Sequence, residues 1–213
     1  MNHLLEILLA LSLVFNFVLL GSTRIGACVI WMAMQGALYS LVPLIAGEEI
    51  TPRILVLATA ALAMKGGIFP WLLIRLRRRT SFHFEVEPYI GFIASLLVGV
   101  CLLAAAATLG QRIHLTAGGY NEGLLTTAFF TILTGLLLIT TRRKAVMQVV
   151  GYLVLENGIY LFGVGTVVEA PMLVELGVLL DAFVAVFVMS IAVYNLSRKF
   201  EVTDVDKLAE LKG

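Results

Sequence analysis

The chain has 213 residues, of which 60% are hydrophobic and 14% are charged, with a formal net charge of +1. A mean hydropathy of +1.00 is far too high for a soluble domain of this length, so the composition predicts an integral membrane protein. With five prolines and no tract rich in serine, glutamine or charge, the sequence leaves no room for a long linker or a sizeable soluble domain. Only the C-terminal sequence SRKFEVTDVDKLAELKG is expected to be an aqueous tail.

Seven apolar segments have about the 20 residues that are needed to cross a hydrocarbon core near 30 Å thick. The first segment lacks a basic region before it and a small-residue cleavage site after it, so we expect a spanning helix and no signal peptide. Glycines, prolines and acidic residues separate the segments. In chain order the segments cover residues 3–20, 25–46, 51–74, 88–109, 122–141, 145–166 and 171–196. The predicted fold is an all-α membrane protein with about seven transmembrane helices.

The lysines and arginines support this number of segments, because basic residues concentrate in cytoplasmic loops. Twelve of the fifteen lie in alternate connections, two (Arg53 and Arg112) lie in the others, and Lys65 lies inside a helix. The pattern predicts an N-terminus outside and a cytoplasmic C-terminus. Basic loops also bind nucleic acid or anionic lipid, but the topology signal explains them without a partner. The twelve are Arg24, Arg75, Arg77, Arg78, Arg79, Arg142, Arg143, Lys144, Arg198, Lys199, Lys207 and Lys212.

Two acids stand near the middle of the last two apolar segments, Glu156 and Asp181. A carboxylate at the centre of a membrane helix costs about 2.5 to 3.5 kcal/mol on insertion scales, and such groups commonly line proton or ion paths. Tyr152 lies one turn from Glu156 on the same face, and Glu175 lies nearer the outer boundary than Asp181. We therefore expect a proton or ion path. The alternative is that the acids are hydrogen-bonding groups that hold helices together.

A lysine lies well inside the third segment, in the sequence ALAMKGGIFPW. Lys65 is followed by Gly66 and Gly67 and then by Pro70, which can interrupt a helix and free backbone groups. The combination predicts a second element of the path. In the alternative interpretation Lys65 extends to the cytoplasmic surface, although it lies ten residues before Arg75.

Cysteines and histidines give no sign of redox chemistry. Cys28 and Cys101 lie in separate apolar runs, and His3, His83 and His114 lie at helix ends or in loops. Neither set has the spacing of a metal site or a disulfide framework, and a phosphate-binding loop, a nucleophile elbow and a haem attachment motif are all absent. We expect that the chain is no enzyme by itself and holds no metal or cofactor.

The region from about residue 130 to the C-terminus resembles the small subunit K of respiratory complex I and the related C subunit of multisubunit cation/proton antiporters. The shared features are a helix that ends in Arg142-Arg143, a helix with Gly151 and Asn157, and the acid Asp181. One departure concerns the subunit K glutamate, which aligns with Leu153.

The acid of this chain, Glu156, stands three residues after Leu153, one turn away on nearly the same face. After this shift Glu156 can still take part in an ion path, but the geometry of that path differs from the one in subunit K.

Nearly the whole chain resembles the hydrogenase-4 membrane component E family. The resemblance rests on GYLVLENG (151–158), APMLVELGVLLDAFVAVFVM (170–189), the terminal TDVDKLAELKG and, more weakly, MKGGIFP (64–70). It implies a non-catalytic subunit of a complex-I-related, formate hydrogenlyase-like hydrogenase in the cytoplasmic (inner) membrane of a prokaryote. Antiporter-like and subunit-H-like membrane subunits would be its neighbours, and peripheral hydrogenase subunits would carry a nickel-iron centre and iron-sulfur clusters.

The resemblance also implies a division of the chain and a role for its buried charges. Residues 1–120 would form an N-terminal four-helix segment, residues 121–197 a three-helix subunit-K-like module, and residues 198–213 a cytoplasmic tail. The expected path residues are Glu156, Asp181, Lys65, Glu175 and Tyr152. Two alternatives remain, a purely structural scaffold and a subunit of a cation/proton antiporter, of which the second is disfavoured by the additional N-terminal helices. The coupling ion and the electron donor and acceptor stay open.

Overall fold

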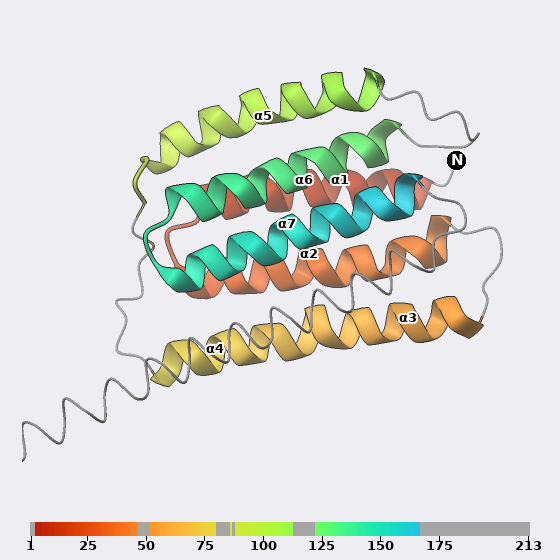
Figure 1. The fold of residues 1–213 in the computed structure, drawn as a ribbon, viewed down its shortest axis with the longest axis horizontal. Coiled ribbons are helices and arrows are strands. Elements are labelled where there is room, and N and C mark those ends of the chain that lie inside the picture. Colours follow the sequence, from red (N-terminus) through yellow and green to blue (C-terminus); the bar gives the residue numbers. More distant parts are fainter. Residues whose placement is uncertain (1–2, 47–51, 80–85, 87, 113–121, 167–213) are drawn as a thin grey trace, which may run out of the picture.

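The computed structural model describes residues 3–46, 52–79, 86, 88–112 and 122–166, and these residues are almost entirely helical. Five of the helices, α1, α2, α5, α6 and α7, are long and apolar enough to cross a membrane. The helical fold class is therefore confirmed, while the predicted segment 171–196 lies outside the described residues. Figure 1 shows the elements, which are α1 (His3–Gly21), α2 (Ile25–Ala46), α3 (Pro52–Ala63), η1 (Met64–Ile68), α4 (Phe69–Arg79), α5 (Phe92–Arg112), α6 (Glu122–Thr141) and α7 (Ala145–Thr166).

The third predicted segment is a rod made of three pieces, α3, η1 and α4, which follow one another along one line (Figure 1). The middle piece, η1, is a π-helical turn that contains Lys65. Its closing hydrogen bond runs from the amide of Phe69 to the carbonyl of Met64, five residues earlier. The sequence signalled a disturbance here through Gly66-Gly67 and Pro70, and the disturbance is one widened turn without a break in the rod.

The fourth predicted helix starts at Phe92 and not at Pro88. Residues 88 and 89 instead run beside the end of α6, where Pro88 forms an isolated bridge with Arg142 and the amide of Tyr89 donates to the carbonyl of Thr141 at 2.8 Å. Pro88 is well suited to this extended position because its φ is fixed and it has no amide to pair. The helix continues to Arg112, three residues beyond the predicted end.

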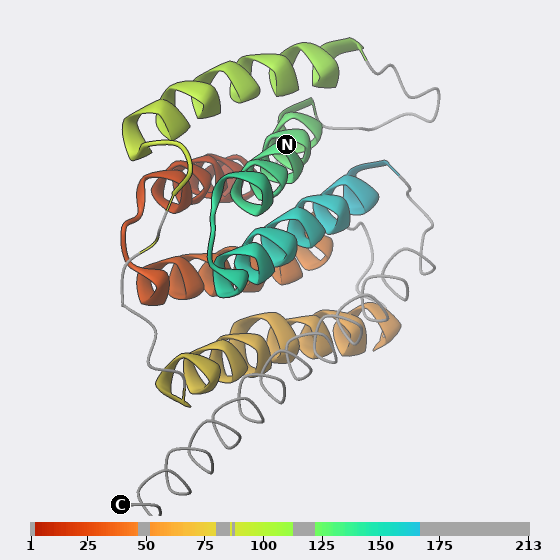
Figure 2. The same cartoon turned by 60° about the vertical axis from the view of Figure 1, so that its left-hand side comes forward.

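The helices lie side by side, with α5 at one edge, the rod α3–η1–α4 at the opposite edge and α1, α2, α6 and α7 between them (Figures 1 and 2). The closest helix pair is α6 with α7, and glycines make this approach feasible. A Cβ on Gly135 would lie 2.5 Å from the amide nitrogen of Leu155, and one on Gly158 would lie 2.6 Å from that of Ile132. Small residues at such contacts are typical of membrane helix packing.

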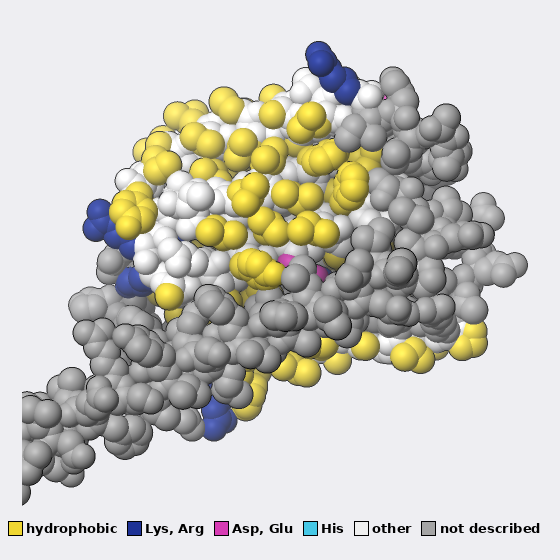
Figure 3. Space-filling model, in the orientation of Figure 1, with side chains coloured by type: hydrophobic (Ala, Val, Ile, Leu, Met, Phe, Trp, Pro, Cys, Tyr) yellow, Lys and Arg dark blue, Asp and Glu magenta, His cyan; other side chains and the backbone are white. Residues whose placement is uncertain are grey.

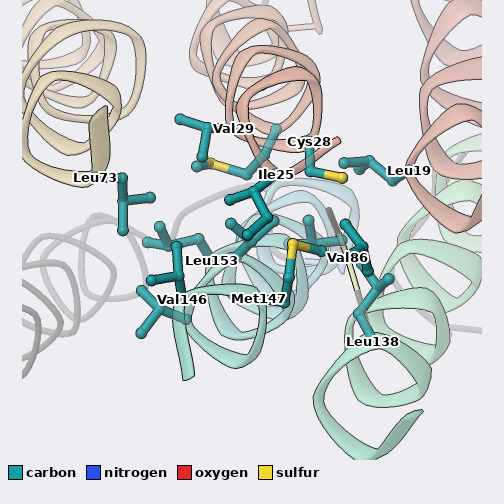
Figure 4. Close-up of a cluster of buried hydrophobic side chains, with 14 of the residues drawn as sticks. Leu19, Ile25, Cys28, Val29, Leu73, Val86, Leu138, Val146, Met147 and Leu153 are labelled. Atoms are coloured by element: carbon teal, nitrogen blue, oxygen red, sulfur yellow. The ribbon is translucent and has the colours of Figure 1, made fainter. Parts of the chain in front are cut away.

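Apolar side chains cover the outside of the bundle as well as its core. On the face shown in Figure 3, hydrophobic side chains lie over α5, α6 and α7, and the lysines and arginines lie near the helix ends. Ile93 on α5, for example, is 78% exposed. In the interior, side chains of α1, α2, α4, α6 and α7 converge on one buried apolar cluster (Figure 4). An apolar outside over apolar packing is what a lipid environment requires.

A buried cluster of uncharged polar side chains joins α1, α2 and α6, and we call it the polar clamp. Thr131 on α6 is its centre, because its hydroxyl lies 2.9 Å from both the amide nitrogen of Asn16 and the hydroxyl of Tyr39. Gln35 donates to the side-chain oxygen of Asn16 at 2.9 Å, and the hydroxyls of Ser12 and Tyr39 are in contact. The clamp consists of Ser12, Asn16, Gln35, Tyr39 and Thr131, all buried.

The hydrogen bonds of the clamp have one consistent direction. The single hydroxyl proton of Thr131 is donated to the backbone carbonyl of Thr127 at 2.8 Å. Thr131 must therefore accept from both Asn16 and Tyr39, which makes Tyr39 a donor to Thr131 and leaves Ser12 as the donor to Tyr39. The clamp therefore connects three helices through a chain of donors that ends on a backbone carbonyl.

Candidate functional site

Lys65 and Glu156 meet in the interior of the bundle. The ammonium nitrogen of Lys65 lies 2.7 Å from Oε1 of Glu156, and the two side chains are only 4% and 1% exposed. The residues come from different helices, η1 and α7, and are 91 positions apart in the sequence. Both charges were predicted to lie at depth in the membrane, and the fold joins them in one ion pair.

Two further groups of α7 surround the ammonium. Asn157 accepts a hydrogen bond from Lys65 Nζ at 3.1 Å, and the ring of Tyr160 lies 4.7 Å from the same nitrogen. A cation over an aromatic face is stabilised by the ring quadrupole, most strongly where water is excluded. We refer to Lys65, Glu156, Asn157 and Tyr160 as the charge site.

The charge site depends on a glycine of α2. A Cβ on Gly36 would lie 2.9 Å from the Cβ of Lys65 and 3.3 Å from the side-chain nitrogen of Asn157. Any larger residue would push η1 or α7 away from α2. Gly36 could not be identified from the sequence, because a glycine in a membrane helix indicates a close approach but not the helix that approaches.

The pair is neutral as a whole, which is what makes its burial tolerable. Removing either partner from a buried ion pair is strongly destabilising, whereas removing both is often nearly neutral. Oε2 of Glu156 is buried and has no hydrogen-bond partner among the residues that the structure describes. The carboxylate therefore keeps one oxygen on which it can accept a proton or a bridging water while the other oxygen holds Lys65.

Of the other three predicted path residues, the structure describes Tyr152 alone. Tyr152, one turn before Glu156, is partly buried and packs against the apolar cluster of Figure 4. Asp181 and Glu175 lie outside the described residues. The interpretation in which Lys65 extends to the cytoplasmic surface is wrong, because its side chain is buried against Glu156.

Arg142 differs from its prediction as a solvated loop residue, because its side chain is fully buried. Its Nη2 donates to the carbonyl of Leu20, at the end of α1, at 2.8 Å, and its guanidinium lies 5.3 Å from the ring of Phe92, at the start of α5. Arg142 thus ties the ends of α1, α5 and α6 together. A cation near the last carbonyls of a helix is favoured by the helix dipole.

The described residues contain no group of three or more histidines, cysteines or acids that could hold a metal ion. Within the same residues both cysteines are free thiols, Cys28 buried and Cys101 exposed. What the described site offers chemically is a pair of opposite charges, an amide and an aromatic ring, which can hold, pass or exchange a proton or a small cation.

The chain is similar to one protein family model and to several known proteins. The model of the family described as NADH-ubiquinone/plastoquinone oxidoreductase chain 4L matches residues 123–213. An uncharacterized protein of Mycobacterium tuberculosis, Rv0085, is 30% identical over 94% of this chain and 97% of its own length. Hydrogenase-4 component E of Escherichia coli and of Shigella flexneri is 27% identical over 76% of this chain and 74% of theirs. No solved structure was found to match.

The matched region contains three of the four residues of the charge site. Glu156, Asn157 and Tyr160 lie within residues 123–213, whereas Lys65 and Gly36 lie outside them. The ion pair therefore links the chain 4L-like region to the helices that precede it.

Proposed function

We propose that the chain, a homologue of hydrogenase-4 component E, is a non-catalytic membrane subunit of a complex-I-related hydrogenase complex and that it takes part in proton or sodium-ion translocation. The family match and the chain 4L-like region support a membrane subunit of a complex-I-like assembly. The role in translocation rests on one observation, the buried Lys65–Glu156 pair at 2.7 Å, in which the second carboxylate oxygen is unpaired within the described part of the chain.

The topology belongs to the same proposal. Counting the rod from Pro52 to Arg79 as one span and residues 171–196 as another gives seven spans, with the N-terminus outside and the C-terminus in the cytoplasm. The basic residues of alternate connections support this orientation. The division into residues 1–120, 121–197 and 198–213 is supported by the family match, which begins at residue 123.

The proposed path contains Glu156 and Lys65, with Asp181, Glu175 and Tyr152 as further members. In this mechanism Glu156 binds a proton or cation on its free oxygen, which weakens its attraction for Lys65. The ammonium then needs another counter-charge, and a neighbouring acid that supplies one would pass the change onward. Such a transfer of charge pairing is a physical way to couple distant events through a membrane bundle.

Electron transfer is assigned to the partners. Peripheral hydrogenase subunits would hold the nickel-iron centre and the iron-sulfur clusters, and antiporter-like and subunit-H-like membrane subunits would flank this chain in the inner membrane. The name of the Escherichia coli relative, a component of hydrogenase-4, supports this type of assembly.

A scaffold is the second candidate, and the additional partners of the Lys65 ammonium favour it. Asn157 and Tyr160 add to the ion pair, as is expected of a site that holds helices together. A subunit of a cation/proton antiporter is the third, and it would share the chain 4L-like region but not require the N-terminal helices.

Proton translocation per electron in inverted membrane vesicles separates path from scaffold. We compare Lys65→Met, Glu156→Gln, Asp181→Asn and the double variant Lys65→Met/Glu156→Gln, after checking assembly on native gels. The control is Glu6→Gln, since the side chain of Glu6 is 53% exposed at the start of α1.

The double variant is decisive. It removes both buried charges, so assembly is expected to recover relative to the single variants. If the site belongs to the path, the assembled double variant transfers electrons without pumping. Normal pumping in the double variant would show that the pair is only a structural link.

A further inference from the structure

The π-helical turn η1 contains Lys65, one of the two charged residues of the buried ion pair. Its widened hydrogen bond, from Phe69 to Met64, accommodates one residue more than an α-helical turn. Lys65 lies inside this turn and is 3% exposed. π-helical turns within α-helices are frequent at functional sites.

Two glycines follow Lys65, and packing against the described residues does not require either of them. A Cβ on Gly67 would meet nothing within 4 Å, and one on Gly66 would make an ordinary 3.5 Å contact with the Cβ of Ala37. Gly36, by contrast, is required by a 2.9 Å approach to Lys65. Glycine is among the least favourable residues in a helix interior. What Gly66 and Gly67 contribute is therefore an adjustable backbone.

Pro70 lowers the cost of moving the turn. Proline has no amide proton, so the hydrogen bond that an α-helix would form between residues 70 and 66 is missing in any case. When the turn moves by one residue toward the N-terminus, the amide of Phe69 exchanges the carbonyl of Met64 for that of Lys65.

We propose that η1 is a hinge that carries Lys65 toward and away from Glu156, with Gly66, Gly67 and Pro70 as the positioning residues. Passage of the widened turn across Lys65 rotates that residue by about 100° around the helix axis, the rotation of one residue in an α-helix. Lys65 keeps its proton as it moves, and Glu156 takes up a proton or cation from the path when the ammonium leaves. This inference rests on the proposed role of the pair in ion translocation.

A hinge would give Lys65 a second position, which a group in a translocation path needs and the observed ion pair alone does not provide. In the observed arrangement Lys65 is held by the carboxylate, by Asn157 and by the ring of Tyr160. A group in a translocation path needs a second arrangement, and coupling needs an element with two discrete states. A shift of the turn supplies the second state without changing the ends of the rod.

The test uses substitutions that stiffen the backbone of the turn without a steric clash with the described residues. Gly67→Ala and Gly66→Ala favour the regular helix, and deletion of Gly67 removes the additional residue, which leaves a continuous α-helix. Gly91→Ala is the matched control, since a Cβ there also meets nothing within 4 Å and Gly91 lies outside the helices. Each variant is expressed in the whole complex, and proton translocation per electron is measured in inverted vesicles.

The hinge predicts a fall of about fivefold for each alanine variant, from the helix preference of alanine over glycine, and a larger fall for the deletion, with assembly intact and Gly91→Ala unchanged. If Lys65→Met abolishes pumping while both alanine variants pump like Gly91→Ala, the path stands and the hinge is refuted. If Lys65→Met pumps normally, the path itself is refuted and the hinge with it. The alanine variants decide the question if the deletion fails to assemble.

Discussion

The substitution Thr131→Val tests the polar clamp at its centre. Valine has nearly the shape of threonine but lacks the hydroxyl that accepts hydrogen bonds from Asn16 and Tyr39, both at 2.9 Å. Each interhelical hydrogen bond in a membrane protein contributes about 0.6 kcal/mol on average and at most about 1.7 kcal/mol. Losing two of them predicts a destabilisation of about 1 to 3 kcal/mol.

Thr140→Val on the same helix is the matched control. The hydroxyl of Thr140 is exposed and bonds only to carbonyls of its own helix, those of Leu136 and Leu137. Its loss should change the free energy of unfolding by no more than about 0.5 kcal/mol. The assay is reversible unfolding in mixed micelles of dodecyl maltoside and sodium dodecyl sulfate, followed by circular dichroism.

Equal stability of the Thr131→Val and Thr140→Val proteins would refute the reasoning. The hydrogen bond between Tyr39 and Thr131 has its own test, a double-mutant cycle. Tyr39→Phe should therefore cost less in the Thr131→Val protein than in the wild type. Additive effects would mean that the two hydroxyls are not coupled.

Three other expectations follow from the same structure. Gly36→Ala places a methyl group 2.9 Å from the Cβ of Lys65 and should destabilise the protein by about 1 to 3 kcal/mol; unaltered unfolding would show that α2 can move aside freely. Arg142→Met removes the donor to the carbonyl of Leu20 and should lower the unfolding temperature by several degrees, whereas Arg143→Met, at an exposed residue, should not. Purified subunit should contain no stoichiometric iron, nickel, flavin or haem, and elemental analysis with absorption spectroscopy checks this.

Helix positions were largely predictable from the sequence, because the length of an apolar run is set by the thickness of the bilayer. The predicted ends of α2, α6 and α7 coincide with the observed ones. The start of α5 was misplaced because the position of Pro88 is decided by its bridge to Arg142, a contact between distant residues. The same contact explains why Arg142 was assigned to a solvated loop.

The candidate site was predictable in its parts but not in its pairing. Depth in an apolar run identified Lys65 and Glu156, yet nothing local indicates that two residues 91 positions apart will meet. The polar clamp, in contrast, has a local signal in the sequence. Ser12 and Asn16, and likewise Gln35 and Tyr39, are spaced by four residues, so each pair shares one face of its helix.

The separation of Lys65 from Glu156 along the chain also bears on how the protein enters the membrane. Ribosomes add about 5 to 20 residues per second, so the lysine emerges roughly 5 to 20 s before the carboxylate that neutralises it. During that interval the lysine helix lacks its counter-ion, at a cost of about 2.5 to 3.5 kcal/mol on insertion scales. We therefore expect the rod α3–η1–α4 to be held less firmly in the membrane until α7 supplies Glu156, and chains truncated before α7 to be degraded faster than the full chain.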